Sequence, residues 1–177
     1  CLVLVTGGLP GGSRDINAAR AMVAEGIAAI LPHAKAAGMP LAIEPLHPMY
    51  ATERCCINTL AQANELCDAL APDDPILGVA VDVYHVHWDP DLAREIARAG
   101  PRILAFHVCD WLVPTKHMLL DRGMMGDGLI DIPHIRGLVE ATGYDGLIEV
   151  EIFSQHWWQR EPDEVLRTVA ERYQTAV

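Results

Sequence analysis

Apolar and polar residues alternate along the chain in two patterns, one of strand length and one of helix length. Short runs rich in valine, isoleucine and leucine are typical of strands buried in a parallel sheet. They predict strands at residues 1–6, 40–44, 77–84, 102–108 and 146–153. Longer segments repeat apolar residues every three or four positions, as one face of a helix does. They predict helices at residues 15–37, 58–70, 90–99, 132–141 and from 162 onward.

Strand and helix follow each other five times, which predicts an α/β fold with a parallel sheet. No linker or internal repeat divides the chain, so residues 1–177 are expected to form a single domain. Parallel α/β units carry functional residues at the carboxyl ends of their strands, both in barrels and in open sheets. Periodicity alone does not distinguish these two architectures.

Three helices have recognisable start signals. Ser13 or Asp15 can cap the first helix, and Asn58 can cap the second. Asp89 followed by Pro90 predicts the start of the third, because proline is favoured at the first helical position.

Four of the predicted strands contain a polar side chain near the carboxyl end. These residues are Glu44, Asp82, His107 and Glu151. A carboxylate in a buried strand is costly unless it is paired. Three carboxylates and an imidazole suit hard or borderline divalent ions, so we expect a metal site for Mn²⁺, with Mg²⁺, Co²⁺ or Zn²⁺ as alternatives. Glu149 has the same parity as Glu151 along its strand, so spacing alone leaves both open as the fourth ligand.

The connection after the fourth strand is much longer than the others. It covers residues 109–131, against the 2–6 residues usual for such loops, which indicates a functional loop or a small lid. Cys109 is expected to face the helix layer and pack in the core. Trp111 is expected either to wall a sugar pocket or to pack between loops. The candidates for contact with a substrate in this loop are Asp110, Trp111, Lys116 and Arg122.

Composition narrows the classes of partner. A formal net charge of −11 argues against a nucleic-acid partner, because nucleic-acid binding draws on basic patches. No apolar run reaches the ~18 residues of a membrane span, so no membrane partner is expected. Five cysteines without a CxxC pair indicate reduced thiols in a cytoplasmic protein. The chain begins at Cys1 rather than at methionine, directly in a predicted strand, which indicates a truncated or processed sequence.

Five stretches together carry a family resemblance. They are LAIEPLHP at 41–48, VDVYH at 81–85, FHVCD at 106–110, GDG at 126–128 and YDGLIEVEIF at 144–153. In this order they resemble the sugar phosphate isomerase/epimerase family, whose members are xylose-isomerase-like TIM barrels. The resemblance implies a (β/α)8 barrel of which this chain supplies the last five β/α units, the first three being absent before Cys1. An open remnant would expose apolar edges, so the chain is expected to be a fragment or to be completed by a neighbouring chain, for instance in a homo-oligomer.

The resemblance also assigns roles to residues. It implies that Glu44, Asp82, His107 and Glu151 bind the metal, and its Glu-Ile-Phe context favours Glu151 over Glu149. It implies that His85 contacts the substrate. Several epimerases of the family carry an arginine at the position of Val113 in this chain. Lys116 or Arg122 is expected to replace that arginine.

The implied chemistry is a divalent-metal-dependent isomerisation or epimerisation of a small sugar or keto-polyol. A divalent ion would stabilise an enediolate as Lewis acid and template, while Glu44 and Glu151 remove and return the proton. His85 is the third residue expected to take part in catalysis.

Three other interpretations remain open at this stage. A metal-dependent dehydratase would act on an inosose-like or dehydroshikimate-like substrate, with His85 as the acid for the leaving hydroxyl. A DNA-repair endonuclease of the same superfamily would need more histidine ligands and a basic groove, and this acidic chain offers little of either. A non-catalytic or incomplete member would bind a metal or a partner and turn nothing over.

Overall fold

Five parallel strands form one curved sheet, in which the spatial order of the strands follows the sequence. The structure is a computed structural model that describes residues 1–177. The strands are β1 (Leu2–Leu4), β2 (Leu41–Ile43), β3 (Leu77–Asp82), β4 (Ile103–Val108) and β7 (Ile148–Val150). All five predicted strands are present, and each is shorter than predicted. A doubly wound sheet would reverse its strand order partway, so the sequential order confirms the prediction of an arc of a barrel.

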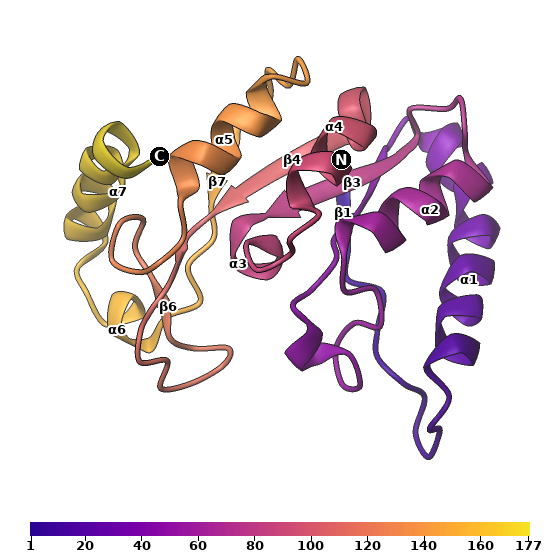
Figure 1. Ribbon diagram of the computed structural model, residues 1–177, viewed down its shortest axis with the longest axis horizontal. Coiled ribbons are helices and arrows are strands. Elements are labelled where there is room, and N and C mark those ends of the chain that lie inside the picture. The colour runs from indigo at the N-terminus through magenta and orange to yellow at the C-terminus, as the bar shows by residue number, and fades with distance from the viewer.

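Helices follow one another around the outside of this arc (Figure 1). The outer helices are α1 (Ile16–Ala37), α2 (Leu60–Leu70), α4 (Leu92–Ala99), α5 (Ile132–Glu140) and α7 (Pro162–Ala176). Shorter elements occupy the connections: α3 (Val83–Val86), α6 (Gln155–Trp158) and the 3-10 turns η1 (Pro48–Tyr50) and η2 (Gly100–Arg102). In the long connection, β5 (Asp110–Trp111) pairs antiparallel with β6 (Arg122–Gly123). None of the helices combines the length and hydropathy needed to cross a bilayer.

The two faces of the sheet carry different apolar residues. Branched and aromatic side chains such as Ile43, Val81 and Phe106 belong to the main core cluster, which lies under the helices. Ala42, Ala80 and Ala105 form a separate small cluster on the other face. Because successive side chains of a strand alternate between the faces, the residue two positions after each alanine also lies on that inner face. Those residues are Glu44, Asp82 and His107.

The helix starts agree with the sequence in one case and differ in two. Asp15 caps α1 as predicted, with its carboxylate accepting from the backbone N–H groups of Asn17 and Ala18. Helix α2 is capped by Thr59, whose hydroxyl accepts a backbone N–H of the first turn, so the assignment of Asn58 is wrong. Asn58 is instead buried, and its side-chain amide donates to two backbone carbonyls of the preceding loop.

The third predicted helix begins later than predicted, and the strand before it ends earlier. Helix α4 starts at Leu92, because Asp89 and Pro90 lie in a turn in which the Asp89 carboxylate accepts from the N–H of Asp91. Strand β3 ends at Asp82, whose carboxylate accepts from the N–H of Tyr84 and so caps the helical turn α3. This short turn places the residues after Asp82 around the end of the sheet.

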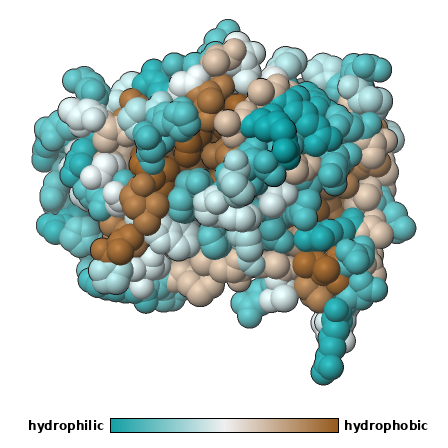
Figure 2. Space-filling view, in the orientation of Figure 1, coloured by the Kyte–Doolittle hydropathy of each residue, from teal (hydrophilic) through white to brown (hydrophobic).

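Both edges of the sheet leave apolar side chains uncovered. At the β1 edge, Val5, Met22 and Ile30 line a groove between β1 and α1. At the β7 edge, Trp158 and Leu166 are 59% and 67% exposed. Figure 2 shows a third apolar area, a brown band that begins between α4 and α5 and runs towards the lower left of the view. The two edge areas are where a further strand and helix would pack in a closed barrel.

Candidate metal centre

Glu44, Asp82, His107 and Glu151 come together at the carboxyl ends of four adjacent strands. Each offers one ligand atom, and these four atoms lie within 4.8 Å of one another. Two ligands on opposite sides of an ion, each bound at ~2.4 Å, are separated by about 4.8 Å. The spacing and the oxygen-rich donor set therefore fit a single divalent cation.

The members of this cluster also contact one another directly. His107 Nδ1 lies 3.0 Å from Glu44 Oε1. Asp82 is fully buried, whereas the Glu151 side chain is 36% exposed. Three of the four ligands, Glu44, Asp82 and His107, are therefore buried, and solvent can reach only Glu151.

Arg122 reaches into the cluster from β6. Its Nη1 donates to Asp82 Oδ2 at 3.0 Å and to Glu151 Oε2 at 2.9 Å, and the guanidinium is stacked 4.3 Å from the centre of the Tyr84 ring. One guanidinium balances only one of the three carboxylates, so two formal negative charges remain when His107 is neutral, as it must be to bind a metal. A divalent cation would neutralise them.

The protonation equilibria reflect this concentration of negative charge. Burial alone would lower the pKa of His107, but the hydrogen bond with Glu44 and the charge of Asp82 outweigh it and raise the pKa to about 9. Burial raises the pKa of Asp82, against the attraction of Arg122. Burial and then the charge of Asp82 raise the pKa of Glu151. All three pKa values are raised, so the cluster favours the uptake of a proton or of a cation.

His85 is buried between the cluster and the loop that follows β2. Its Nε2 lies 3.0 Å from Arg122 Nη2, and its Nδ1 lies 3.2 Å from the backbone N–H of His47. Burial and then the neighbouring charge of Arg122 hold the pKa of His85 well below its usual range. A neutral imidazole accepts at one nitrogen only, so one of the two contacts is a hydrogen bond in a given tautomer. His85 therefore lies beside Arg122 and accepts a hydrogen bond from it only in the tautomer that leaves Nε2 unprotonated.

Asp110 holds a loop rather than facing an open pocket. Its Oδ2 accepts from the N–H groups of Gly126 and Gly128, and its Oδ1 accepts from those of Trp111 and Ile130. The residue is fully buried, so both oxygens are committed to the backbone. A side chain at Gly128 would collide with the Trp111 backbone, which explains the glycine. The geometry therefore does not support the expectation that Asp110 contacts a substrate.

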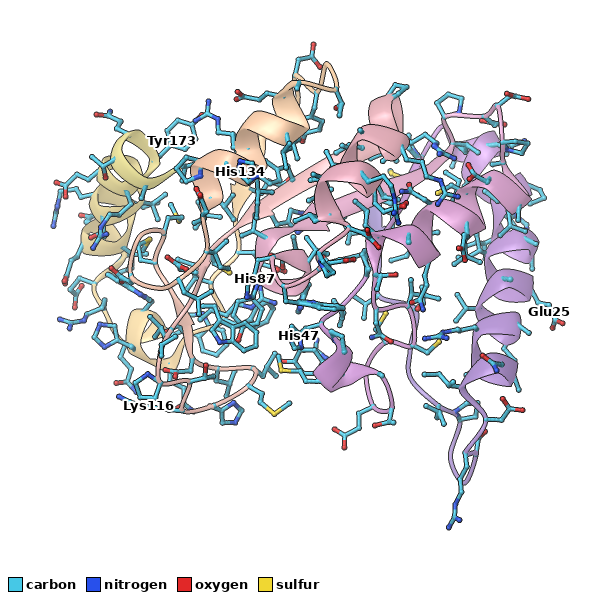
Figure 3. The ribbon with its side chains drawn as sticks, viewed as in Figure 1. Glu25, His47, His87, Lys116, His134 and Tyr173 are labelled. Atoms are coloured by element: carbon cyan, nitrogen blue, oxygen red, sulfur yellow. The ribbon has the colours of Figure 1, made fainter.

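The other expected substrate contacts divide between the site and its surroundings. Arg122 lies in the ligand cluster, whereas Lys116 is exposed at the outer loop, far from His47 and His87 in Figure 3. Trp111 stacks on Tyr84 and lies with its ring 5.0 Å from the His47 ring, beside the cluster. Of the two candidates for replacing the arginine expected at Val113, the structure brings only Arg122 to the cluster.

Two further residues lie near the cluster, and the expected orientation of one of them, Cys109, is wrong. Cys109 is buried as expected, but its Sγ lies 3.7 Å from Arg122 Nη1, so it faces the cluster and not the helix layer. Glu149 is not among the four clustered ligands, yet its Oε2 lies 3.9 Å from His107 Nε2. Both share the strand parity of a ligand, Cys109 with His107 and Glu149 with Glu151. The alanines two positions before Glu44, Asp82 and His107 carry the same signal for the inner face.

Comparisons with known proteins agree with the architecture. A crystal structure of a Sinorhizobium meliloti 1021 protein is 65% identical, with a TM-score of 0.96 over 99% of this chain and 64% of that chain. The IolI protein with a bound zinc atom is 21% identical, with a TM-score of 0.78 over 99% of this chain and 61% of that chain. The inosose isomerase of Halalkalibacterium halodurans is 27% identical over 139 residues, 76% of this chain and 47% of the relative. The chain spans about half the length of the curated relatives it matches.

The match to a family as a whole extends over almost the entire chain. Residues 1–175 match the xylose isomerase-like TIM barrel family. The strand order, the outer helices and the ligand cluster at the strand ends are those of such a barrel. This chain therefore belongs to the xylose isomerase-like TIM barrel family.

Proposed function

We propose that this chain carries the metal site of a divalent-metal-dependent isomerase or epimerase that acts on a small sugar or keto-polyol. The observation that carries the proposal is the cluster of four ligand atoms within 4.8 Å at the ends of four parallel strands. Relatives support the reaction class. They include inosose isomerases and, among structures that share the fold, 3-keto-D-glucoside 4-epimerase and D-psicose 3-epimerase.

Glu44, Asp82, His107 and Glu151 would hold the cation. When bound, it would withdraw electrons from a substrate carbonyl and so acidify the neighbouring carbon–hydrogen bond. Zinc is bound in IolI, so Zn²⁺ is to be tested beside Mn²⁺.

Glu44 and Glu151 are suited to move the proton. They follow β2 and β7, which are separated by two strands, so they approach a bound molecule from different sides. One carboxylate would remove the carbon-bound proton and the other would return it. Glu151 is the most exposed member of the cluster, which leaves it accessible to a substrate.

Arg122 and Trp111 would orient the substrate. Arg122 is the cation inside the cluster, and its stacking on Tyr84 fixes the plane of the guanidinium. Trp111 presents an aromatic surface next to His47 at the mouth of the site. His85 would act through Arg122, which it contacts.

The five strands would serve as part of an eight-stranded barrel. The exposed apolar residues at both sheet edges support this, because barrel closure removes such edges. Three further β/α units would supply the rest of the barrel and of the pocket wall.

Exchange of a carbon-bound proton with solvent tests the function. The full-length protein, stripped with a chelator and reloaded with Mn²⁺ or Zn²⁺, would be incubated in D2O with inosose, D-psicose or a 3-keto-D-glucoside. Deuterium is expected in at least one substrate with metal and in none without it. Glu44→Gln should abolish the exchange, while Glu65→Gln, at an exposed position on α2, should not. Absence of exchange in every substrate at saturating metal would contradict the proposed function.

A further inference from the structure

Glu149 lies beside His107 on the inner face of the sheet. The two residues are partners in the register between β4 and β7. The residues on either side of Glu149 in β7, Ile148 and Val150, pack against the main core on the opposite face. Alternation along β7 therefore directs the Glu149 side chain to the side of the ligand cluster.

A rotation of the Glu149 side chain can shorten the distance between the two side chains to that of a hydrogen bond. Glu149 Oε2 lies 3.9 Å from His107 Nε2, and the Glu149 side chain is 60% exposed. The structure shows no hydrogen bond of its carboxylate to any other residue, so rotation about its side-chain bonds breaks no such contact. The opposite ring nitrogen, Nδ1, faces Glu44 at 3.0 Å.

These positions distinguish the two nitrogens of His107. Nδ1 is next to another member of the ligand cluster, so it is the nitrogen placed to bind a cation. A neutral imidazole carries one N–H, which must then be on Nε2. Histidines that bind metals commonly donate this second N–H to a carboxylate, which fixes the tautomer and the ring orientation.

We propose that Glu149 accepts the Nε2–H of His107 and holds the ring in the tautomer that presents Nδ1 to a divalent cation. The inference rests on the proposed metal site and makes Glu149 a positioning residue that does not touch the metal. The negative charge of Glu149 also makes the ring a stronger electron donor, which tightens metal binding.

Metal affinity measured without substrate tests this role. The dissociation constant for Mn²⁺ would be determined in the full-length protein by competition with a chelator. Glu149→Ala is expected to weaken binding by about 10- to 100-fold, the range typical for loss of such a partner. Glu149→Gln should weaken it less, because the amide oxygen still accepts a hydrogen bond. Glu65→Ala, at an exposed position on α2, should leave it unchanged.

A spectroscopic readout separates positioning from a general loss of structure. In the Zn²⁺-loaded protein, the Nε2–H of His107 should give a proton resonance that exchanges slowly with water. Glu149→Ala should broaden or remove that resonance, while the backbone amide spectrum should still be that of a folded protein. A persistent resonance in this variant would overturn the proposal.

The affinity measurement also distinguishes the two levels of inference. Equal Mn²⁺ affinity in wild type and Glu149→Ala would overturn the role of Glu149 and leave the metal site standing. Absence of Mn²⁺ binding in wild type would overturn the metal site and, with it, the role of Glu149.

Discussion

At the scale of single residues, Arg122 carries the most consequence for the site. It is 2% exposed and donates to both Asp82 and Glu151, so it offsets part of the charge that four strand ends bring together. A buried carboxylate that loses its partner becomes an uncompensated charge. The cation and Arg122 therefore share one task, the neutralisation of these carboxylates.

The variant Arg122→Met tests this sharing. In the chelator-treated protein it is expected to lower the free energy of unfolding by about 3–5 kcal/mol, the usual cost of breaking a buried pair on one side. Added Mn²⁺ should recover more stability in the variant than in wild type. Chemical denaturation with and without Mn²⁺ measures both effects. Arg167→Met, at an exposed position on α7, is the control, and an equal loss there would contradict the prediction.

The two glutamates of β7 are expected to differ in catalysis. Glu151→Gln should abolish carbon–hydrogen exchange even at saturating metal, because an amide cannot accept the proton. Glu149→Gln should retain exchange once the Mn²⁺ concentration compensates for weaker binding. Exchange rates measured over a Mn²⁺ titration separate the two. The reverse result would show that the proton-transfer carboxylate is one pleat away from the position assigned to it.

At the scale of elements, the β5–β6 connection is organised by one carboxylate. Asp110 accepts four backbone N–H groups, three of which tie the segment from Gly126 to Ile130 to β5. Because β6 carries Arg122, the order of this connection determines how well Arg122 is held in the cluster.

Asp110→Asn is expected to loosen this segment. Each carboxylate oxygen accepts two N–H groups, and the NH2 group that replaces one oxygen could accept from neither, so two N–H groups would lose their partner. Hydrogen exchange of the backbone amides of Gly126, Gly128 and Ile130 should become faster, while the amides of α1 should not change. Unchanged exchange rates at the amides of Gly126, Gly128 and Ile130 would contradict the role given to Asp110.

At the scale of the whole molecule, the carboxyl ends of the strands carry the full ligand cluster, whereas the two edges of the sheet are uncovered. The ligand cluster forms within the described strands, but the apolar side chains of Val5 and Leu166 at the two edges remain exposed. The proposed eight-stranded barrel would cover both.

A polypeptide limited to residues 1–177 is therefore expected to lack exchange activity and to self-associate as its concentration rises. The physical reason is the exposed apolar surface at both edges, together with the part of the pocket wall that the proposed further β/α units would supply. Sedimentation and the deuterium-exchange assay, with the full-length protein as control, measure these two properties. A monomeric and active 1–177 polypeptide would contradict the need for barrel closure.

Much of the architecture could be predicted from the sequence because it depends on local patterns. Apolar runs of strand length identified all five strands, and helical periodicity identified the five outer helices. The polar residues Glu44, Asp82 and His107, which interrupt these runs, identified three members of the cluster, since parallel strands end at one edge of a sheet. Spacing left Glu149 and Glu151 open for the fourth position, and only the family resemblance favoured Glu151.

The remaining features depend on where distant segments meet, which spacing along the chain does not specify. The long connection folds back so that Arg122 enters the cluster while Lys116 stays outside, and four amide groups converge on Asp110. The contact of Glu149 with His107 depends on the register between β4 and β7. Local periodicity determined the strands and the face on which their ligands lie. Which charged residues surround the ligands depends on backbone hydrogen bonds in the long connection and on the register between strands. Only the tertiary structure decided these two features.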